Sequence, residues 1–143
     1  MSRHVVGRAS DLGDGERLIV EVAGRSIGIF RVGDRFYGLR NRCPHAGGEL
    51  CRGRVVGRLS SDRPGRYVHD RSRPLVACPW HGWEFDLATG QSYIDPRRLR
   101  VRPYEVQALQ GEALAAGPYR AETIPVSLDD EYLVVTLGGA GEG

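Results

Sequence analysis

The chain has 143 residues, of which 41% are hydrophobic and 27% are charged, and it contains 20 glycines. This length suits one compact domain and leaves no room for a separate catalytic domain. The mean hydropathy is −0.35, and no apolar run approaches the roughly 20 residues that span a bilayer, which argues for a soluble protein. The formal net charge of +2 indicates neither nucleic-acid binding nor membrane binding.

Short β-rich runs separated by glycine-containing turns follow one another from Arg17 onward. We find no long apolar stripe with the 3.6-residue period of a helix, so the sequence predicts an all-β fold. The expected strands are Arg17–Val22, Ser26–Val32, Arg35–Leu39, Val55–Leu59, Arg66–His69, Leu75–Ala77, Trp83–Asp86, Leu99–Val106, Thr123–Ser127 and Tyr132–Leu137.

Only Gln107–Ala116 has a composition that favours a helix, and its glycine leaves a loop as an equal alternative. The glycine-rich tail at 138–143 cannot build a core, and we expect it to be disordered. No linker or internal repeat divides the rest, so we expect a single domain over residues 1–137.

Three cysteines are an odd number, and the first residues do not form the apolar core of a signal peptide. A disulfide framework needs paired cysteines and export, so we expect reduced thiols or metal ligands in a cytoplasmic protein.

Two segments each combine one thiol with one imidazole. Cys43 and His45 lie in the segment CPHAGG, and Cys78 and His81 lie in the segment CPWHGW. A proline stiffens each segment, and the glycines allow the backbone to approach a buried cofactor with its N–H groups pointing inward. Inorganic sulfide accepts such hydrogen bonds, so the pattern favours a metal site formed by two loops.

These two segments resemble the signature of the Rieske family, C-x-H and C-x-x-H, each followed closely by glycine. The resemblance implies an antiparallel β-sandwich or barrel with a small cluster-binding subdomain, formed by two loops over about residues 40–96. It also implies one [2Fe–2S] cluster per chain, with Cys43 and Cys78 on the inner iron and His45 and His81 on the outer, more exposed iron.

A structural zinc site is the alternative for the same four residues. Zinc fingers usually place their ligands as a cysteine pair and a histidine pair, whereas each segment here is mixed. The other two histidines, His4 and His69, lie near the N-terminus and in an expected hairpin, and we expect both to be solvated.

The two segments are farther apart than in many ring-oxygenase relatives, because 32 residues separate His45 from Cys78. The intervening sequence is polar and contains a Pro-Gly turn signal, which predicts an inserted surface hairpin at about 55–74. Since the cost of closing a loop grows only logarithmically with its length, the ligands can still converge.

Three further positions bear on the branch of the family. Respiratory-complex members carry a disulfide between the loops, and one of its two cysteines stands between the Cys and His of the second segment. That position is Trp80 here, so we expect Cys51 to be a free, packed thiol.

Trp83 stands where high-potential members have a serine that hydrogen-bonds the cluster. Because indole has no hydroxyl, we expect a potential in the lower part of the Rieske range of roughly −150 to +300 mV. The segment Tyr93–Pro96 resembles the proline-containing loop that covers the cluster in relatives.

Four arginines crowd one short stretch of the sequence, namely Arg97, Arg98, Arg100 and Arg102. They suit either a solvated strand edge, where charge discourages pairing between sheets, or a docking patch for an acidic partner. The sequence leaves both interpretations open.

The resemblance implies a one-electron carrier that takes electrons from a flavin reductase and passes them to a terminal oxygenase or similar redox enzyme. No histidine follows His81, so an oxygenase-type mononuclear iron has no ligands in the expected places. No G-x-G-x-x-G fingerprint for a flavin or nicotinamide cofactor is present, and no catalytic site is apparent. The alternatives are a small Rieske subunit of a larger, nitrite-reductase-like complex and a zinc-stabilised interaction module.

Overall fold

Strands account for nearly all of the secondary structure in the computed structural model. The model describes residues 2–44, 47–63, 66–79, 82–92, 100–115, 120–121 and 130–138. The strands in these ranges are β1 (Ser2–Arg8), β2 (Arg17–Val22), β3 (Arg25–Val32), β4 (Arg35–Arg40), β5 (Arg54–Arg63), β6 (Arg66–Ala77), β7 (Glu84–Asp86), β8 (Pro103–Gln110), β9 (Arg120–Ala121) and β10 (Glu131–Leu137). The helices described are all short: the 3₁₀ turns η1 (Ala9–Asp11) and η2 (Leu50–Arg52), and α1 (Gly111–Ala115).

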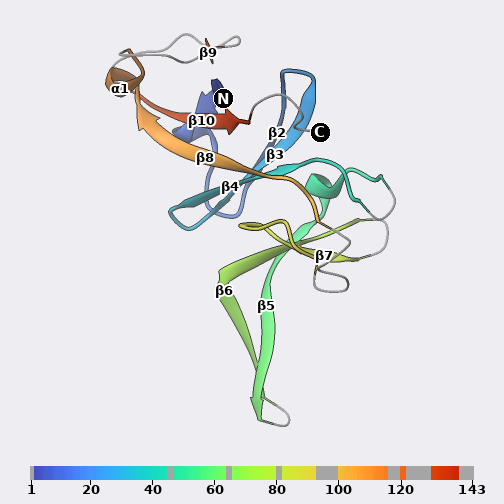
Figure 1. Ribbon diagram of the computed structural model, residues 1–143. Coiled ribbons are helices and arrows are strands. Elements are labelled where there is room, and N and C mark those ends of the chain that lie inside the picture. Colours follow the sequence, from blue (N-terminus) through green and yellow to red (C-terminus); the bar gives the residue numbers. More distant parts are fainter. Residues whose placement is uncertain are drawn as a thin grey trace.

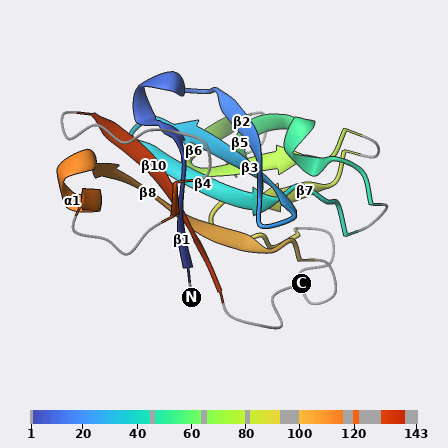
Figure 2. The same ribbon diagram turned by 90° about the horizontal axis from the view of Figure 1, so that it is seen from above.

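The larger sheet has seven strands in the order β2-β3-β4-β8-β10-β1-β9, and all its neighbours are antiparallel except β1 and β9. The sheet curls so that Gly7 of β1 lies against Leu18 of β2, which makes it barrel-like (Figures 1 and 2). Alternating apolar residues fill its interior, among them Ile27, Leu133 and Val135, and water is excluded from this core.

A tight turn at Ala23 and Gly24 joins β2 to β3. Both residues have positive φ, 49° and 79°, which is the backbone conformation of a type I′ hairpin. This turn sets the register in which Val22 pairs with Arg25.

The smaller sheet has three strands in the order β5-β6-β7. Its three strands follow one another in the sequence, whereas the larger sheet combines β1 to β4, which precede them, with β8 to β10, which follow them. Beyond the level of β7, β5 and β6 continue as a two-stranded ribbon that points away from the larger sheet (Figure 1). The polar segment 55–74 lies in this hairpin.

The predicted all-β fold class is confirmed, and the differences from the expected elements are local. The sequence reading missed β1, which pairs with β10, and it placed His4 in solvent, although the side chain of His4 is 2% exposed and hydrogen-bonds Ser2 at 2.8 Å. The helix-favouring segment Gln107–Ala116 is helical only at α1 (Gly111–Ala115), and its first part continues β8 as far as Gln110, because pairing with β10 outweighs local propensity there.

The expected strand Leu99–Val106 is displaced, since β8 begins only at Pro103. The expected strands Arg66–His69 and Leu75–Ala77 are parts of the single strand β6. The expected strand Thr123–Ser127 and the tail at 139–143 lie outside the described residues.

Candidate metal centre

Two loops each begin with a buried cysteine. Loop 1 (residues 43–48) follows β4, and loop 2 (residues 78–83) joins β6 to β7. Cys43 is 0% exposed and Cys78 is 2% exposed, and both belong to one core cluster with Leu50. The thiols from the two loops therefore face the same protected region.

The described ends of the two loops have the same backbone hydrogen bonds. In loop 1 the N–H of Cys43 donates to the carbonyl of Gly48 at 2.8 Å, and the N–H of Gly47 donates to the carbonyl of Cys43 at 2.7 Å. In loop 2 the N–H of Cys78 donates to Trp83 at 2.8 Å, and the N–H of Gly82 donates to Cys78 at 2.8 Å.

The glycine four residues after each cysteine has positive φ, which is 77° in Gly47 and 71° in Gly82. An L side chain is strained in this conformation, so glycine permits the tight turn. The two cysteines thus occupy the same position in two matching turns.

The histidines predicted as ligands, His45 and His81, lie outside the described residues, and so does Trp80. In the sequence, each histidine falls between the cysteine and the positive-φ glycine of its loop. Within the described ranges, no group of three or more histidine, cysteine, aspartate or glutamate side chains could hold a metal ion.

The described part of the site fits the thiolate side of an iron–sulfur cluster. Its two cysteines are buried and not joined in a disulfide, and each lies in a turn with a positive-φ glycine four residues later. Thiolates are the protein ligands of iron–sulfur clusters, and low exposure protects them from competing reactions.

The third cysteine, Cys51, lies in the turn η2 behind loop 1 and is 0% exposed. It is free, and its thiol donates to the carbonyl of Leu39 at 3.5 Å. Burial raises the pKa of Cys51 from 9.0 to about 12, although a hydrogen bond from the Gly28 backbone and the charge of Arg17 act in the opposite direction. This thiol is therefore a neutral packing group at ordinary pH.

Trp83 and four arginines lie close to the loops in the sequence, and the structure describes some of these residues. Trp83 is partly buried and packs against the core cluster that contains both cysteines. The expected covering loop, Tyr93–Pro96, lies outside the described residues with Arg97 and Arg98. Arg100 and Arg102 are exposed, which leaves a strand edge and a docking patch as alternatives for this stretch.

Sequence reasoning missed a set of contacts behind the loops. Arg17 of β2 and Asn41, which follows β4, both hydrogen-bond the main chain near Cys51. The sequence carries no local signal for these contacts, because Arg17 and Cys51 are 34 residues apart.

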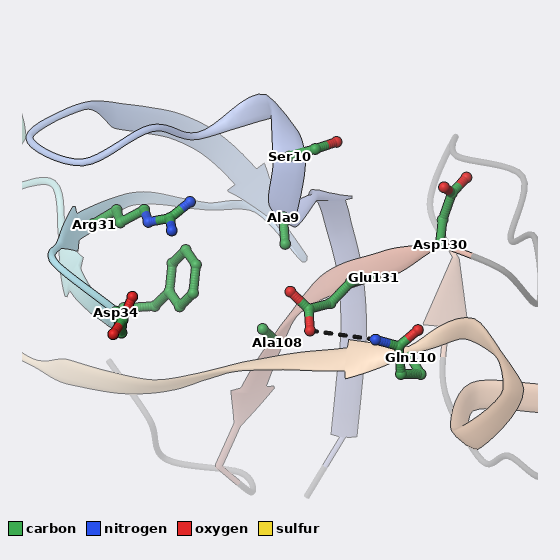
Figure 3. Close-up of a pocket in the computed structure, with 9 residues that line it drawn as sticks. Ala9, Ser10, Arg31, Asp34, Ala108, Gln110, Asp130 and Glu131 are labelled. Carbon is green, nitrogen blue, oxygen red and sulfur yellow. Dashed lines mark hydrogen bonds between the residues drawn. The ribbon is translucent and has the colours of Figure 1, made fainter.

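A separate open pocket of about 510 Å³ lies between η1, the β3–β4 turn, β8 and β10. Three carboxylates, those of Asp34, Asp130 and Glu131, line it together with Arg31 (Figure 3). None of its lining residues belongs to loop 1, loop 2 or the smaller sheet, so it is not part of the cysteine site.

No helix in the described part of the chain is long and apolar enough to cross a membrane.

Comparison with known proteins places these features in a family. The family model of the Rieske [2Fe–2S] domain matches residues 2–105. Ferredoxin CarAc of Metapseudomonas resinovorans is 28% identical over 110 residues, which are 76% of this chain and 88% of the relative. The ferredoxin component of the naphthalene 1,2-dioxygenase system of Pseudomonas putida is 26% identical over 98 residues, covering 68% of this chain and 79% of the relative.

A solved structure supports the fold independently. The putative NADH-dependent nitrite reductase small subunit of Mycobacterium tuberculosis superposes with a TM-score of 0.64 at 21% identity. The match covers 96% of each chain. With the family match over residues 2–105 and the paired cysteine turns, the chain belongs to the Rieske [2Fe–2S] domain family and binds one [2Fe–2S] cluster.

Proposed function

We propose that the cluster is held by Cys43 and Cys78 on one iron and by His45 and His81 on the other. The observation that carries this assignment is the pair of matching turns, each with a buried cysteine at its first position. The histidines enter through the family signature, in which each turn supplies one thiolate and one imidazole.

The protein acts as a one-electron carrier, and the bound cluster supplies the reversible uptake of a single electron. Its partners are a flavin-dependent reductase as donor and a terminal oxygenase or a similar redox enzyme as acceptor. The names of the relatives support this role, since both are ferredoxins and one is a component of a dioxygenase system. The catalytic subunit of an oxygenase would need two further histidines for a mononuclear iron. Outside the two loops the chain has only His4, which is buried and hydrogen-bonded to Ser2, and His69.

A second candidate is a small subunit of a larger redox complex. It is favoured by the similarity in fold to the nitrite reductase small subunit. A free carrier purifies alone and exchanges electrons by collision, whereas a subunit purifies with a large partner.

The three cysteines are buried and not joined in disulfides, which suits a reducing compartment, so we place the protein in the cytoplasm.

Metal analysis and spectroscopy test the ligand assignment. We expect a red-brown protein with about two irons and two acid-labile sulfides per chain, the content of one [2Fe–2S] cluster. His81→Cys should abolish the Rieske electron paramagnetic resonance spectrum of the reduced protein, because imidazole ligation distinguishes this site from an all-cysteine cluster. His69→Gln is the matched control and should leave the spectrum unchanged. One zinc and no sulfide in the wild-type protein would overturn the assignment.

A further inference from the structure

The segments that lead to the two loops meet behind the metal centre. The turn η2 continues from loop 1 into β5, and Gly53 follows it directly. A side chain at Gly53 would overlap the carbonyl group of Ala77, the residue that precedes Cys78. Arg54 is also the strand partner of Ala77. The placement of this turn is therefore coupled to the placement of both cysteines.

Arg17 reaches from β2 of the larger sheet to this junction. Its Nη1 donates to the carbonyl of Cys51 at 2.9 Å and also to the carbonyl of Gly53. The guanidinium lies over the ring of Phe30, 5.4 Å from its centroid, so its orientation is fixed from a second side. One side chain of the barrel thus holds the turn at its middle residue and at the residue that follows it.

Asn41 holds the same turn from another direction. Its Oδ1 accepts the N–H of Cys51 at 2.8 Å, and its Nδ2 donates to Oγ of Ser26 at 3.1 Å. The side chain is buried, with 8% exposure, and it lies two residues before Cys43. Asn41 therefore connects loop 1, the turn behind it and the barrel.

We propose that Arg17 and Asn41 are positioning residues for the [2Fe–2S] cluster, because they clamp the junction that fixes loop 1 relative to loop 2. This inference rests on the proposed ligand set and adds to it the barrel groups that hold the ligand loops in place. Outer groups of this kind tune a metal site by orienting its ligands. Without the clamp, η2 can shift against Ala77, and the spacing between Cys43 and Cys78 changes with it.

The chain offers a matched control in Arg31 of β3. Arg31 also donates to two main-chain carbonyls, those of Gly33 at 3.0 Å and Leu12 at 2.8 Å. It also lies over a phenylalanine, 5.4 Å from the centroid of the Phe36 ring. Its carbonyl partners lie at turns of the larger sheet, away from η2 and both loops. Arg17→Met and Arg31→Met remove the same kinds of contact at two different places.

The test compares the holo forms of Arg17→Met, Asn41→Ala and Arg31→Met with the wild-type protein. We measure the rate at which visible absorbance is lost to an iron chelator, the reduction potential and the resonance spectrum of the reduced cluster. Arg17→Met and Asn41→Ala should lose the cluster about tenfold faster, with a shifted potential and altered spectrum, because buried or charge-assisted hydrogen bonds at the junction are gone. Arg31→Met should match the wild type in all three readouts.

Several outcomes would overturn the inference. If Arg17→Met and Arg31→Met lose the cluster equally fast with unchanged spectra, the Arg17 contacts stabilise the barrel without positioning the cluster. If Arg17→Met does not fold, Asn41→Ala decides the question, because it removes the hydrogen bond to Cys51 without changing any charge. Wild-type cluster loss, potential and spectrum in Asn41→Ala would overturn the inference. Failure of the ligand assignment would be seen separately, as a wild-type protein without iron and sulfide.

Discussion

The two sheets of the protein differ in how their strands are assembled. The seven-stranded sheet combines β1 to β4 with β8 to β10, so its pairings join distant parts of the chain. The three-stranded sheet is built from consecutive strands between residues 54 and 86, and it carries loop 2 at its end. The barrel therefore depends on long-range pairing, whereas the smaller sheet is a local insertion into it.

The two regions also differ in their cores. The barrel core is closed by its own strands and includes Ile27, Leu133 and Val135. The core around the cysteines includes Phe30 and Leu39 of the barrel in addition to Val76 and Phe85 of the smaller sheet. The cluster-binding region thus uses the barrel as one wall. Changes at the contact between the regions should affect the cluster most, and changes at their far ends should affect it least.

Gly53→Ala should have the largest effect of the changes considered. The added methyl group would overlap the carbonyl of Ala77, which is backbone and cannot turn aside. We expect a loss of about 3 kcal/mol in the free energy of unfolding, at the upper end for overpacking, and a low iron content. Urea unfolding and metal analysis provide the two measurements.

Gly7→Ala is the barrel counterpart of this change. A methyl group at Gly7 meets only Leu18, at an ordinary contact distance of 3.4 Å. We expect a change within about 1 kcal/mol and full iron content. Equal losses in the two variants would contradict the view that the contact between Gly53 and Ala77 is special to the site.

The sequence indicates candidate ligands but not the contacts behind them. Cys43 and Cys78 each lie in one short motif with a proline and a glycine, so local pattern alone marks them as candidate cluster ligands, and that assignment stays a prediction. The hydrogen bonds of Arg17 join residues 34 and 36 positions apart, and nothing in the local sequence distinguishes this arginine from exposed ones. Contacts of this kind become visible only when the strands have been assembled.

The same reason explains the errors in the fold. His4 belongs to a short, charged segment that resembles a frayed terminus, and only its pairing with β10 buries it. Gln107–Gln110 has a helix-favouring composition, and its strand state comes from pairing with Glu131–Val134. Runs rich in β-branched and aromatic residues between turn signals were sufficient to find β2, β3 and β10.

Cys51 makes stability depend on alkaline pH, and up to one or two pH units above pH 9 this effect stays below that of Gly53→Ala. Its pKa is about 12 in the folded protein and 9.0 when exposed, because burial disfavours the thiolate. Between these values the unfolded chain has lost the proton and the folded chain retains it. Stability is therefore unaffected by this group below pH 9 and falls by about 1.4 kcal/mol per pH unit as pH rises from 9 toward 12.

Cys51→Ala removes this titration and isolates its contribution. The variant should lose some stability at pH 8, because a buried side chain is shortened, but it should decline less steeply between pH 9 and pH 11. Parallel stability curves for wild type and variant over this range would show that burial does not raise the pKa of the Cys51 thiol in the folded protein. Urea unfolding at each pH is the measurement.

The smallest effect on the cluster is expected from removing the distal part of the β5–β6 ribbon. The register of these strands shifts between Gly57, which pairs with Pro74, and Arg58, and beyond this point none of the described strands pairs with the ribbon as a third strand. Figure 1 shows it pointing away from the larger sheet. Residues 58–73 include five arginines and two aspartates, so the segment is a polar, positively charged extension.

Replacing residues 58–73 by the four-residue loop Gly-Asn-Gly-Ser keeps Gly57 opposite Pro74. The loop is longer than a two-residue turn because Pro74 has no N–H to close such a turn. The shorter connection lowers the entropic cost of loop closure by about 1 kcal/mol, and the lost strand pairing offsets part of this gain. We therefore expect unchanged iron content, an unchanged resonance spectrum and a stability within about 1 kcal/mol of wild type. Loss of the cluster would contradict the separation between the ribbon and the site. Slower electron transfer to an acidic partner with an intact cluster would instead assign the arginines of the ribbon to docking, because opposite charges steer association.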